Sequence, residues 1–286
     1  MMQINYAKDG ITFERAIKLI DHVFPGAKDM VAQGKELGAY WQDASTPFII
    51  EKNNQFIAHL GIVPIDITLA NKAQHLAILH GVCVHPKYRG QGYFKQLMEE
   101  ALPYLHKNFD ATLLFTDNPE LYIPFGYKTY PQYDFLIPIP QPSSSEASLK
   151  RLYLQQAEDL ALFNRIYKNR VPLTADVDIS HRILYLFNSL EMKLFYAKTL
   201  DAIIVCKAHK KLYLQDILSS QTLSFSEVLS VLPHEYTEVI LQFHPGNWLG
   251  TPYQTLAAKT KGVLMACAHF SPADKTTFRW NEMARC

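Results

Sequence analysis

The residues best suited to chemistry lie within residues 82–98, where an apolar run leads into two glycines and several basic side chains. Gly90 and Gly92 let the backbone come close to a ligand, and a helix expected to begin beside them presents N–H groups without helical acceptors. A helix N-terminus carries about half a positive charge. Full positive charges stand nearby, on Lys87, Arg89 and Lys95. The loop is therefore typical of a site for pyrophosphate or another anion.

Two glycines at this spacing also form a simple tight turn, so the loop needs support from its surroundings. The sequence contains neither the GxxxxGK[ST] loop of nucleoside triphosphate sites nor a GxGxxG run followed by a ribose-binding acid. Sites for nucleoside triphosphates and for dinucleotides are therefore disfavoured.

Residues 89–93, RGQGY, resemble the Q/R-x-x-G-x-G/A signature of the GNAT acetyltransferase superfamily. A second segment, residues 118–127 with the sequence NPELYIPFGY, resembles the family's segment in which an asparagine is followed by a tyrosine and then by Gly-Phe or Gly-Tyr. Phe94 departs from the signature, which has a small residue there, and its ring is expected to tighten the phosphate pocket. The chain is similar to the enhanced intracellular survival-type branch, without that branch's sterol-carrier-like third domain.

The resemblance implies acetyl-CoA as the co-substrate, held by three groups of residues. The loop would bind the phosphates through Lys87, Arg89, Gly90, Gln91, Gly92 and Tyr93. The strand before the loop would pair with the pantetheine arm through backbone groups of Val82, Cys83 and Val84. Asn118 would contact the same molecule, although an asparagine before Pro119 also suits a helix N-cap. Cys83 is expected to be an inert buried residue rather than an acyl carrier.

The resemblance also implies direct transfer of the acetyl group to a primary amine in a ternary complex. Tyr122 would be the general acid that protonates the departing thiolate, and an aromatic packing residue is the alternative interpretation. A base must take a proton from the acceptor. The candidates are His80 and, by analogy with the survival-type branch, the terminal carboxylate of Cys286. His85, before Pro86, is expected to be a structural residue at a strand end.

The composition limits the remaining possibilities. A chain of 286 residues with 48% hydrophobic and 19% charged residues suits two folded domains. A net charge of +1 provides no overall field for nucleic acid or for a membrane surface, so neither is an expected partner. No signal peptide or membrane-spanning stretch is recognisable, and a cytoplasmic protein is expected. The expected partner is a small-molecule or peptide amine acceptor, and an oligomer is left open.

The cysteines are scattered along the chain without a CxxC pair, at Cys83, Cys206, Cys267 and Cys286. This spacing suggests neither a zinc site nor a disulfide framework, and no metal cofactor is expected. Reduced thiols are therefore the default expectation.

The expected fold is α/β (α+β) in two domains. Residues 1–137 fit a GNAT-like mixed twisted sheet flanked by helices, and residues 138–150 form a linker rich in proline and serine. Residues 151–286 are expected to form a second, degenerate GNAT-like α/β domain.

Hydrophobic periodicity predicts the elements. In the first domain these are a strand at 3–6, helices at 13–23 and 27–37, strands at 48–51, 56–63, 65–69, 76–84 and 111–116, a short helix at 119–123, and a closing strand pair at 127–137. The helix after the loop is expected to kink or end at Pro103. In the second domain the predicted elements are helices at 152–168, 181–190 and 224–232, and strands at 194–197, 202–208, 211–217 and 238–243.

Two other functions are compatible with these residues. One is a catalytically silent acyl-CoA-binding or sensor protein that keeps the loop. The other is a protein-interaction module in which the glycines only make a turn. Trp41 and residues 24–26 are expected to lie near the acceptor.

Overall fold

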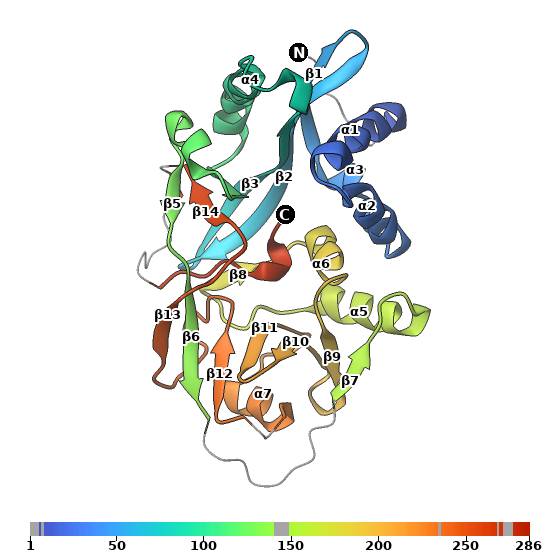
Figure 1. Cartoon of the computed structure of the whole chain (residues 1–286). Coiled ribbons are helices and arrows are strands. Elements are labelled where there is room, and N and C mark those ends of the chain that lie inside the picture. The colour runs from blue at the N-terminus through green and yellow to red at the C-terminus, as the bar shows by residue number, and fades with distance from the viewer. Residues whose placement is uncertain (1–5, 7–8, 140–148, 234–235, 268, 271–276) are drawn as a thin grey trace.

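The computed structural model describes residues 6, 9–139, 149–233, 236–267, 269–270 and 277–286. Within these residues the chain forms two twisted mixed sheets flanked by helices (Figure 1), which confirms the predicted fold class. The strand predicted at residues 3–6 lies outside the described residues except for Tyr6, and so does most of the predicted linker.

The first sheet has the strand order β1-β2-β3-β4-β14-β5, with β8 pairing at the far end of β2. β3 and β4 are parallel, and the other pairs are antiparallel. The bounds are β1 Thr46–Lys52, β2 Gln55–Leu69, β3 Lys72–Val84, β4 Ala111–Thr116, β5 Lys128–Tyr130, β8 Val177–Ile179 and β14 Val263–Ala266.

Helices cover both faces of this sheet (Figure 1). On one face lie α1 Gly10–Val23, α2 Ala27–Glu36 and α3 Trp41–Ala44. On the other lies α4 Tyr93–Asn108, whose Leu97, Met98 and Ala101 pack against the apolar side chains of β2. The spacing of these residues matches the predicted apolar stripe of this helix.

Two prolines are tolerated where the sequence suggested breaks. β2 runs without interruption through Pro64, so the two strands predicted at 56–63 and 65–69 are one. α4 continues past Pro103, which is exposed, and the carbonyl that loses its helical partner can bond to water. The predicted short helix at 119–123 is instead two 3₁₀ turns, η3 Pro119–Leu121 and η4 Ile123–Phe125.

The two sheets exchange strands. The closing pair predicted at 127–137 is wrong, because β5 pairs with β14 while β6 Tyr133–Pro138 crosses into the second sheet. In return β14, from the C-terminal part of the chain, lies between β4 and β5 in the first sheet. The division of the chain into domains at residues 138–150 stays a prediction, and strand pairing crosses it in both directions.

The second sheet has the order β13-β6-β12-β11-β10-β9-β7. It repeats the plan of the first sheet, since an antiparallel hairpin, β10–β11, is followed by a helix, α7, and by a parallel strand, β12. The bounds are β7 Leu149–Leu152, α5 Ala157–Asn169, α6 Arg182–Asn188, β9 Leu194–Ala197, β10 Ala202–Ala208, β11 Leu212–Ser219, α7 Phe225–Val231, β12 Glu238–Leu241 and β13 Gln254–Ala257.

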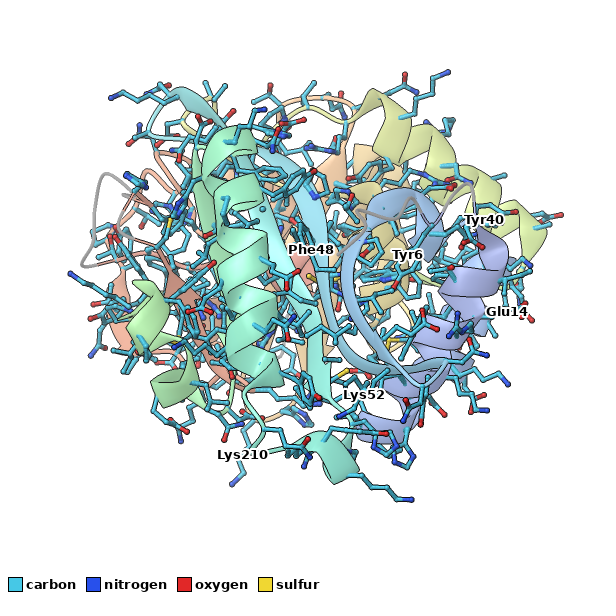
Figure 2. All side chains as sticks on the ribbon, turned by 90° about the horizontal axis from the view of Figure 1, so that it is seen from above. Tyr6, Glu14, Tyr40, Phe48, Lys52 and Lys210 are labelled. Atoms are coloured by element: carbon cyan, nitrogen blue, oxygen red, sulfur yellow. The ribbon has the colours of Figure 1, made fainter. Side chains whose placement is uncertain are left out.

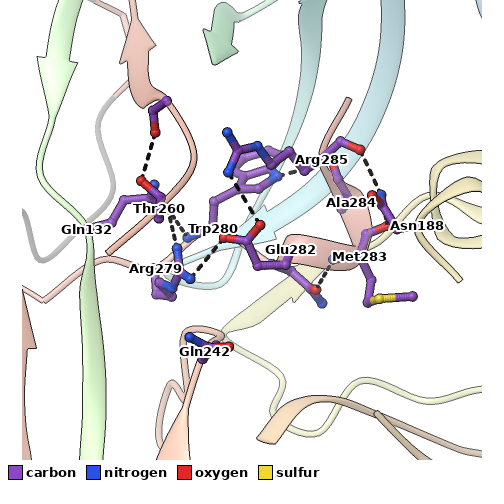
Figure 3. A network of polar contacts seen from close by, with 12 residues as sticks. Gln132, Asn188, Gln242, Thr260, Arg279, Trp280, Glu282, Met283, Ala284 and Arg285 are labelled. Carbon is purple, nitrogen blue, oxygen red and sulfur yellow. Dashed lines mark hydrogen bonds and ion pairs between the residues drawn. The ribbon is translucent and has the colours of Figure 1, made fainter. Parts of the chain in front are cut away.

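A buried polar network ties the last residues of the chain to β6 (Figure 3). Arg279 is 1% exposed, and its guanidinium lies 3.0 Å from Asp134 Oδ1 and 2.9 Å from Glu282 Oε1. The contact with Asp134 is close but lacks hydrogen-bond geometry. Gln132 completes the network, since its side-chain oxygen accepts from the Trp280 N–H at 3.0 Å. Loss of Arg279 would leave the Asp134 carboxylate without its neighbouring cation, whereas Glu282 would keep its contact with Arg285 at 3.4 Å. Arg279 therefore joins the C-terminal segment to β6.

Because β14 completes the first sheet, we predict that Met265→Ala destabilises the protein by about 2–5 kcal/mol, as expected for a fully buried side chain. Val263→Ala, in the same strand but 36% exposed, is the control and should cost less than about 1 kcal/mol. Chemical denaturation of both variants measures the difference. Equal effects of the two substitutions would argue against a core role for β14.

Candidate functional site

The parallel strands β3 and β4 diverge partway along their length. Their pairing covers only Leu76–Leu79 with Ala111–Leu114, although β3 continues to Val84 and β4 to Thr116. Beyond this point each strand keeps its outer partner, β2 for β3 and β14 for β4. The inner edges of the two strand ends therefore have no strand partner in the part of the chain that the structure describes.

The backbone of Val84 faces this divergence. The next residue, His85, donates its N–H to the Ile57 carbonyl of β2 at 2.8 Å. Since backbone groups alternate along a strand, those of Val84 point away from β2 and toward β4. An extended, amide-containing ligand laid between the strand ends would meet these groups as it would meet a neighbouring strand.

The glycine loop follows directly and opens onto the start of α4. Gly90 and Gly92 have φ of 74° and 85°, in the left-handed region, and a Cβ at either position would meet no atom within 4 Å. Glycine is therefore required for backbone conformation rather than for space. Gly92 is the N-cap of α4, makes no side-chain capping bond, and is followed by no acidic residue in the first turn. The N–H groups of this turn are left for a ligand.

The loop's own polar side chains fold back onto its backbone. Arg89 Nε donates to the Val84 carbonyl at 3.2 Å, and Gln91 Nε2 donates to the Lys87 carbonyl at 3.2 Å. These bonds join the loop to the end of β3 and hold its shape. The loop itself is exposed.

Lys52, at the end of β1, adds a positive charge whose place has no local signal in the sequence (Figure 2). Its Nζ donates to the Tyr93 hydroxyl at 3.1 Å and lies 5.6 Å from the ring centre of Tyr88. The bond to Tyr93 raises the pKa of Lys52, so the amine stays protonated. The two tyrosines flank the glycine loop in sequence, but β1 is far away along the chain, and only the tertiary structure shows the proximity.

The equivalent helix start in the second sheet is closed. α7 begins with a capping box in which Ser224 Oγ accepts from the Glu227 N–H, and the Glu227 carboxylate accepts from the Ser224 N–H at 2.7 Å. A carboxylate thus occupies the place where an anion would bind, and it repels further negative charge. Of these two helix starts, only that of α4 is left without a side-chain cap.

Tyr122 lies between the two 3₁₀ turns and is 6% exposed. Its ring packs perpendicular to that of Phe94, with centroids 5.3 Å apart, and lies 6.1 Å from that of Tyr127. Burial raises the pKa of Tyr122 to about 12, and the neighbouring Cys83 adds to the shift. No hydrogen bond joins the Tyr122 hydroxyl to another described residue. The group is therefore a protonated phenol with a free donor.

Three neighbours of Tyr122 clarify its role. Phe94, where the chain departs from the family signature, supports the Tyr122 ring instead of facing the exposed loop. Tyr127 is the packing member, 1% exposed, with its hydroxyl 2.8 Å from Thr112 Oγ1. Asn118 is exposed and stands at the N-cap position of η3 before Pro119, as expected, but its side chain makes no capping bond there.

His80 is buried and bonded. Its Nε2 lies 2.7 Å from Ser45 Oγ, and its ring packs edge-on against Trp41 with centroids 4.7 Å apart. The ring lies directly over Gly61, where any Cβ would collide with it. Burial lowers the pKa of His80 to about 3, because the charged form is desolvated. Such an imidazole is a poor proton acceptor at neutral pH.

Cys83 and His85 have the structural surroundings that were expected. Cys83 is 5% exposed and burial raises its pKa to about 12, so the thiol is not a ready nucleophile. His85 ends β3, where its Nδ1 accepts from the Lys87 N–H at 3.3 Å and its ring stacks on that of His22.

Cys286 packs against the apolar cluster on the face of the sheet opposite α4, which also holds Trp41 and Phe115 at its edge. Tyr122 belongs to the cluster under α4. The proposed acid and the terminal residue thus lie on opposite faces of the first sheet. His80 is linked to the Cys286 side through Trp41.

No helix among the described residues combines the length and apolar character needed to cross a bilayer. Over the same residues, no group of three or more histidine, cysteine, aspartate and glutamate side chains is arranged to hold a metal ion.

Residues 6–130 match the family model of the acetyltransferase (GNAT) domain. This match covers the glycine loop and the segment from Asn118 to Tyr127, and it confirms the resemblance that they suggested. Among curated proteins none matches the chain.

Solved structures share the fold of nearly the whole chain. A probable N-acyltransferase from Enterococcus faecalis V583 is 14% identical over 93% of this chain and 71% of its own, with a TM-score of 0.57. Eis1 from Mycobacterium abscessus is 12% identical over 91% and 72%, with a TM-score of 0.57. A GCN5-related N-acetyltransferase from Kribbella flavida is 14% identical over 93% and 69%, with a TM-score of 0.52. At these identities the likeness establishes the fold.

The burial of His80 makes stability depend on pH. The unfolded histidine takes up a proton below about pH 6.5, whereas the folded one does so only near pH 3. Protons therefore favour the unfolded state in this window, and stability falls as the pH falls. We predict that His80→Asn reduces the slope of unfolding free energy against pH by about 1.4 kcal/mol per pH unit between pH 6 and 4. Ser45→Ala, which leaves the imidazole in place, should keep the wild-type slope in the same denaturation series.

Proposed function

We propose that this protein is an acetyl-CoA-dependent N-acetyltransferase that transfers the acetyl group directly to a primary amine. The observation that carries the proposal is the meeting of three features at one strand end: the open start of α4, the divergence of β3 from β4, and the Tyr122 hydroxyl, which has no hydrogen-bond partner among the described residues. An anion site, a slot for an extended amide arm and a proton donor follow one another in this order along the fold.

The residues of the site are arranged to bind a CoA thioester along its length, from the phosphates to the sulfur. The first-turn N–H groups of α4 and the cations Lys52, Lys87 and Arg89 would hold the pyrophosphate. The backbone of Val84 would pair with the amides of the pantetheine arm, and Asn118 would contact the arm from the side of β4. Acetyl-CoA supplies the acyl group as a thioester.

Tyr122 would complete the reaction as the acid. Formation of the C–N bond breaks the C–S bond and leaves a thiolate that needs a proton. The phenol of Tyr122 carries one throughout the neutral range, since burial holds its pKa near 12. Its hydroxyl has no competing acceptor among the described residues. Proton donation by a positioned side chain contributes typically about 10²–10⁴ to a rate.

The acceptor would be a small-molecule or peptide amine, which must lose a proton before it attacks. His80 is a weak candidate for this base because its pKa is about 3 and Ser45 occupies its Nε2. The terminal carboxylate of Cys286 stays the other candidate, on the face that bears Trp41. All four cysteines are free thiols, which supports placing the protein in the reducing cytoplasm.

The weakness of His80 as a base also favours a second candidate, a catalytically silent acyl-CoA-binding protein. Such a protein would bind acetyl-CoA through the same loop and strand end without turnover. The two functions differ in the release of CoA in the presence of a broad panel of amines.

Tyr122→Phe should lower kcat by about 100-fold or more while leaving acetyl-CoA affinity within about threefold, because the ring and its packing on Phe94 are kept. The matched control, Tyr127→Phe, loses only a bond to Thr112 and should retain kcat within about threefold. Steady-state CoA release and calorimetric binding supply the measurements. Full activity of the Tyr122 variant would remove this residue from the mechanism.

Gly92→Val should weaken CoA binding by about 30-fold or more, because a β-branched residue does not adopt a φ of 85° and the start of α4 must rearrange. Gly10→Ala, at an unstrained glycine with open space around it, is the control and should bind normally. Isothermal calorimetry with CoA measures both. Unchanged binding by a folded Gly92→Val protein would mean that the glycines only make a turn.

A further inference from the structure

β3 contains a bulge immediately before the residues that face β4. The register places His80 opposite Gly61 and Cys83 opposite His59, so one residue of β2 faces two residues of β3. The first of the two, Gly81, has a φ of 54°. An extra residue that begins with a left-handed glycine is the G1 type of bulge.

This extra residue decides which backbone groups face the divergence. Because the groups alternate along a strand, insertion of one residue reverses their direction for the rest of the strand. With the bulge, the groups of Val84 point toward β4. Without the bulge, the backbone groups of Val84 would point toward β2, and the backbone groups of Cys83 would face β4 instead. The pairing surface offered to an extended ligand thus depends on the bulge.

The imidazole of His59 holds the bulge by one bond and is itself held by another. His59 Nδ1 lies 2.8 Å from the Gly81 carbonyl oxygen, which can only accept, so Nδ1 carries the hydrogen. Nε2 is then an acceptor, and the Tyr6 hydroxyl donates to it at 2.8 Å. Tyr6 lies between α1 and the strands of the first sheet (Figure 2). These two bonds specify a single tautomer of the ring.

The fit between His59 and the bulge is close. His59 is fully buried, and a Cβ at Gly81 would lie 3.4 Å from two atoms of its ring. Burial lowers the pKa of His59 to about 4, so the ring stays neutral with one donor and one acceptor. An aliphatic side chain would fill this space but could not bind the carbonyl.

We propose that His59 is a positioning residue for the acyl donor: its Nδ1–H fixes the Gly81 carbonyl and thereby the register that turns Val84 toward the divergence. This inference rests on the proposed function, because the ligand that Val84 would meet is the pantetheine arm of acetyl-CoA. The first-turn N–H groups of the phosphate site belong to α4, beyond the strand end, and the bond from Arg89 to the Val84 carbonyl links the loop to this register.

The test compares two probes, acetyl-CoA and 3′-phospho-ADP, which is the nucleotide end of CoA without the arm. In His59→Leu the affinity for acetyl-CoA should fall by about tenfold or more, as expected for lost backbone bonds, while the affinity for 3′-phospho-ADP changes by less than about threefold. A general loss of stability would not change the preference between the probes. His59→Asn, whose amide nitrogen can donate from about the place of Nδ1, should recover most of the preference.

Tyr6→Phe is the matched control, because it removes the bond to Nε2 and leaves the bond to Gly81. It should keep the wild-type preference for acetyl-CoA within about threefold. A folded His59→Leu protein with the full wild-type preference overturns the role of His59 and leaves the proposed function standing. A wild-type protein that binds neither probe overturns the proposed function and this inference together.

Nitrogen NMR of the wild-type imidazole provides a test that needs no variant. The expected signature is a neutral ring with the hydrogen on Nδ1 at pH 7, retained when acetyl-CoA is added. A ring with the hydrogen on Nε2 would contradict the bond to Gly81 and overturn the proposal even if the leucine variant does not fold.

Discussion

The parallel pairing between β3 and β4 stops at Leu79 and Leu114, and neither strand ends there. Where the two strands separate, the backbone groups on their outer edges still need a partner, because unpaired groups in a folded interior are costly. β2 provides this partner for β3, and β14 provides it for β4. β14 comes from the far end of the chain. The slot in the first sheet therefore depends on a strand contributed by the C-terminal part of the protein.

The two sheets share one plan, but only the first presents an open helix start. The hairpin, helix and parallel strand recur in both, and the difference lies in a few residues at the N-terminus of the helix. α4 begins at a glycine with no side chain to cap it, whereas α7 begins with Ser224 and Glu227 bonded to each other's backbone. One helix keeps its donors for a ligand, and the other uses them internally. Local capping thus distinguishes the two helix starts.

Buried histidines line β2 and β3 on the face that α1 covers, and both are neutral. His59 and His80 have centroids 6.1 Å apart, and burial holds both pKa values well below the ordinary range. Each histidine makes a specific bond through a ring nitrogen. His59 bonds to the Gly81 carbonyl, and His80 bonds to the Ser45 hydroxyl. Their chemistry is that of fixed donors and acceptors rather than of proton carriers, which explains why a histidine in the right strand need not be the base.

Local patterns in the sequence were sufficient for the loop, for the start of α4 and for strands such as β4, β9 and β10, because glycine placement and hydrophobic periodicity act over a few residues. The segment around Tyr122 was recognisable from its spacing, and the structure adds its burial and a hydroxyl without a hydrogen-bond partner in the described part of the chain. The exchange of β6 and β14, the approach of Lys52 to the loop and the bond from His59 to Gly81 have no local signal. Each joins residues far apart in the chain, and such pairing is selected by the packing of the complete sheets. The sequence by itself determined the glycine loop and the segment around Tyr122, because local spacing specifies both, and only the tertiary structure decided how the strands between them open.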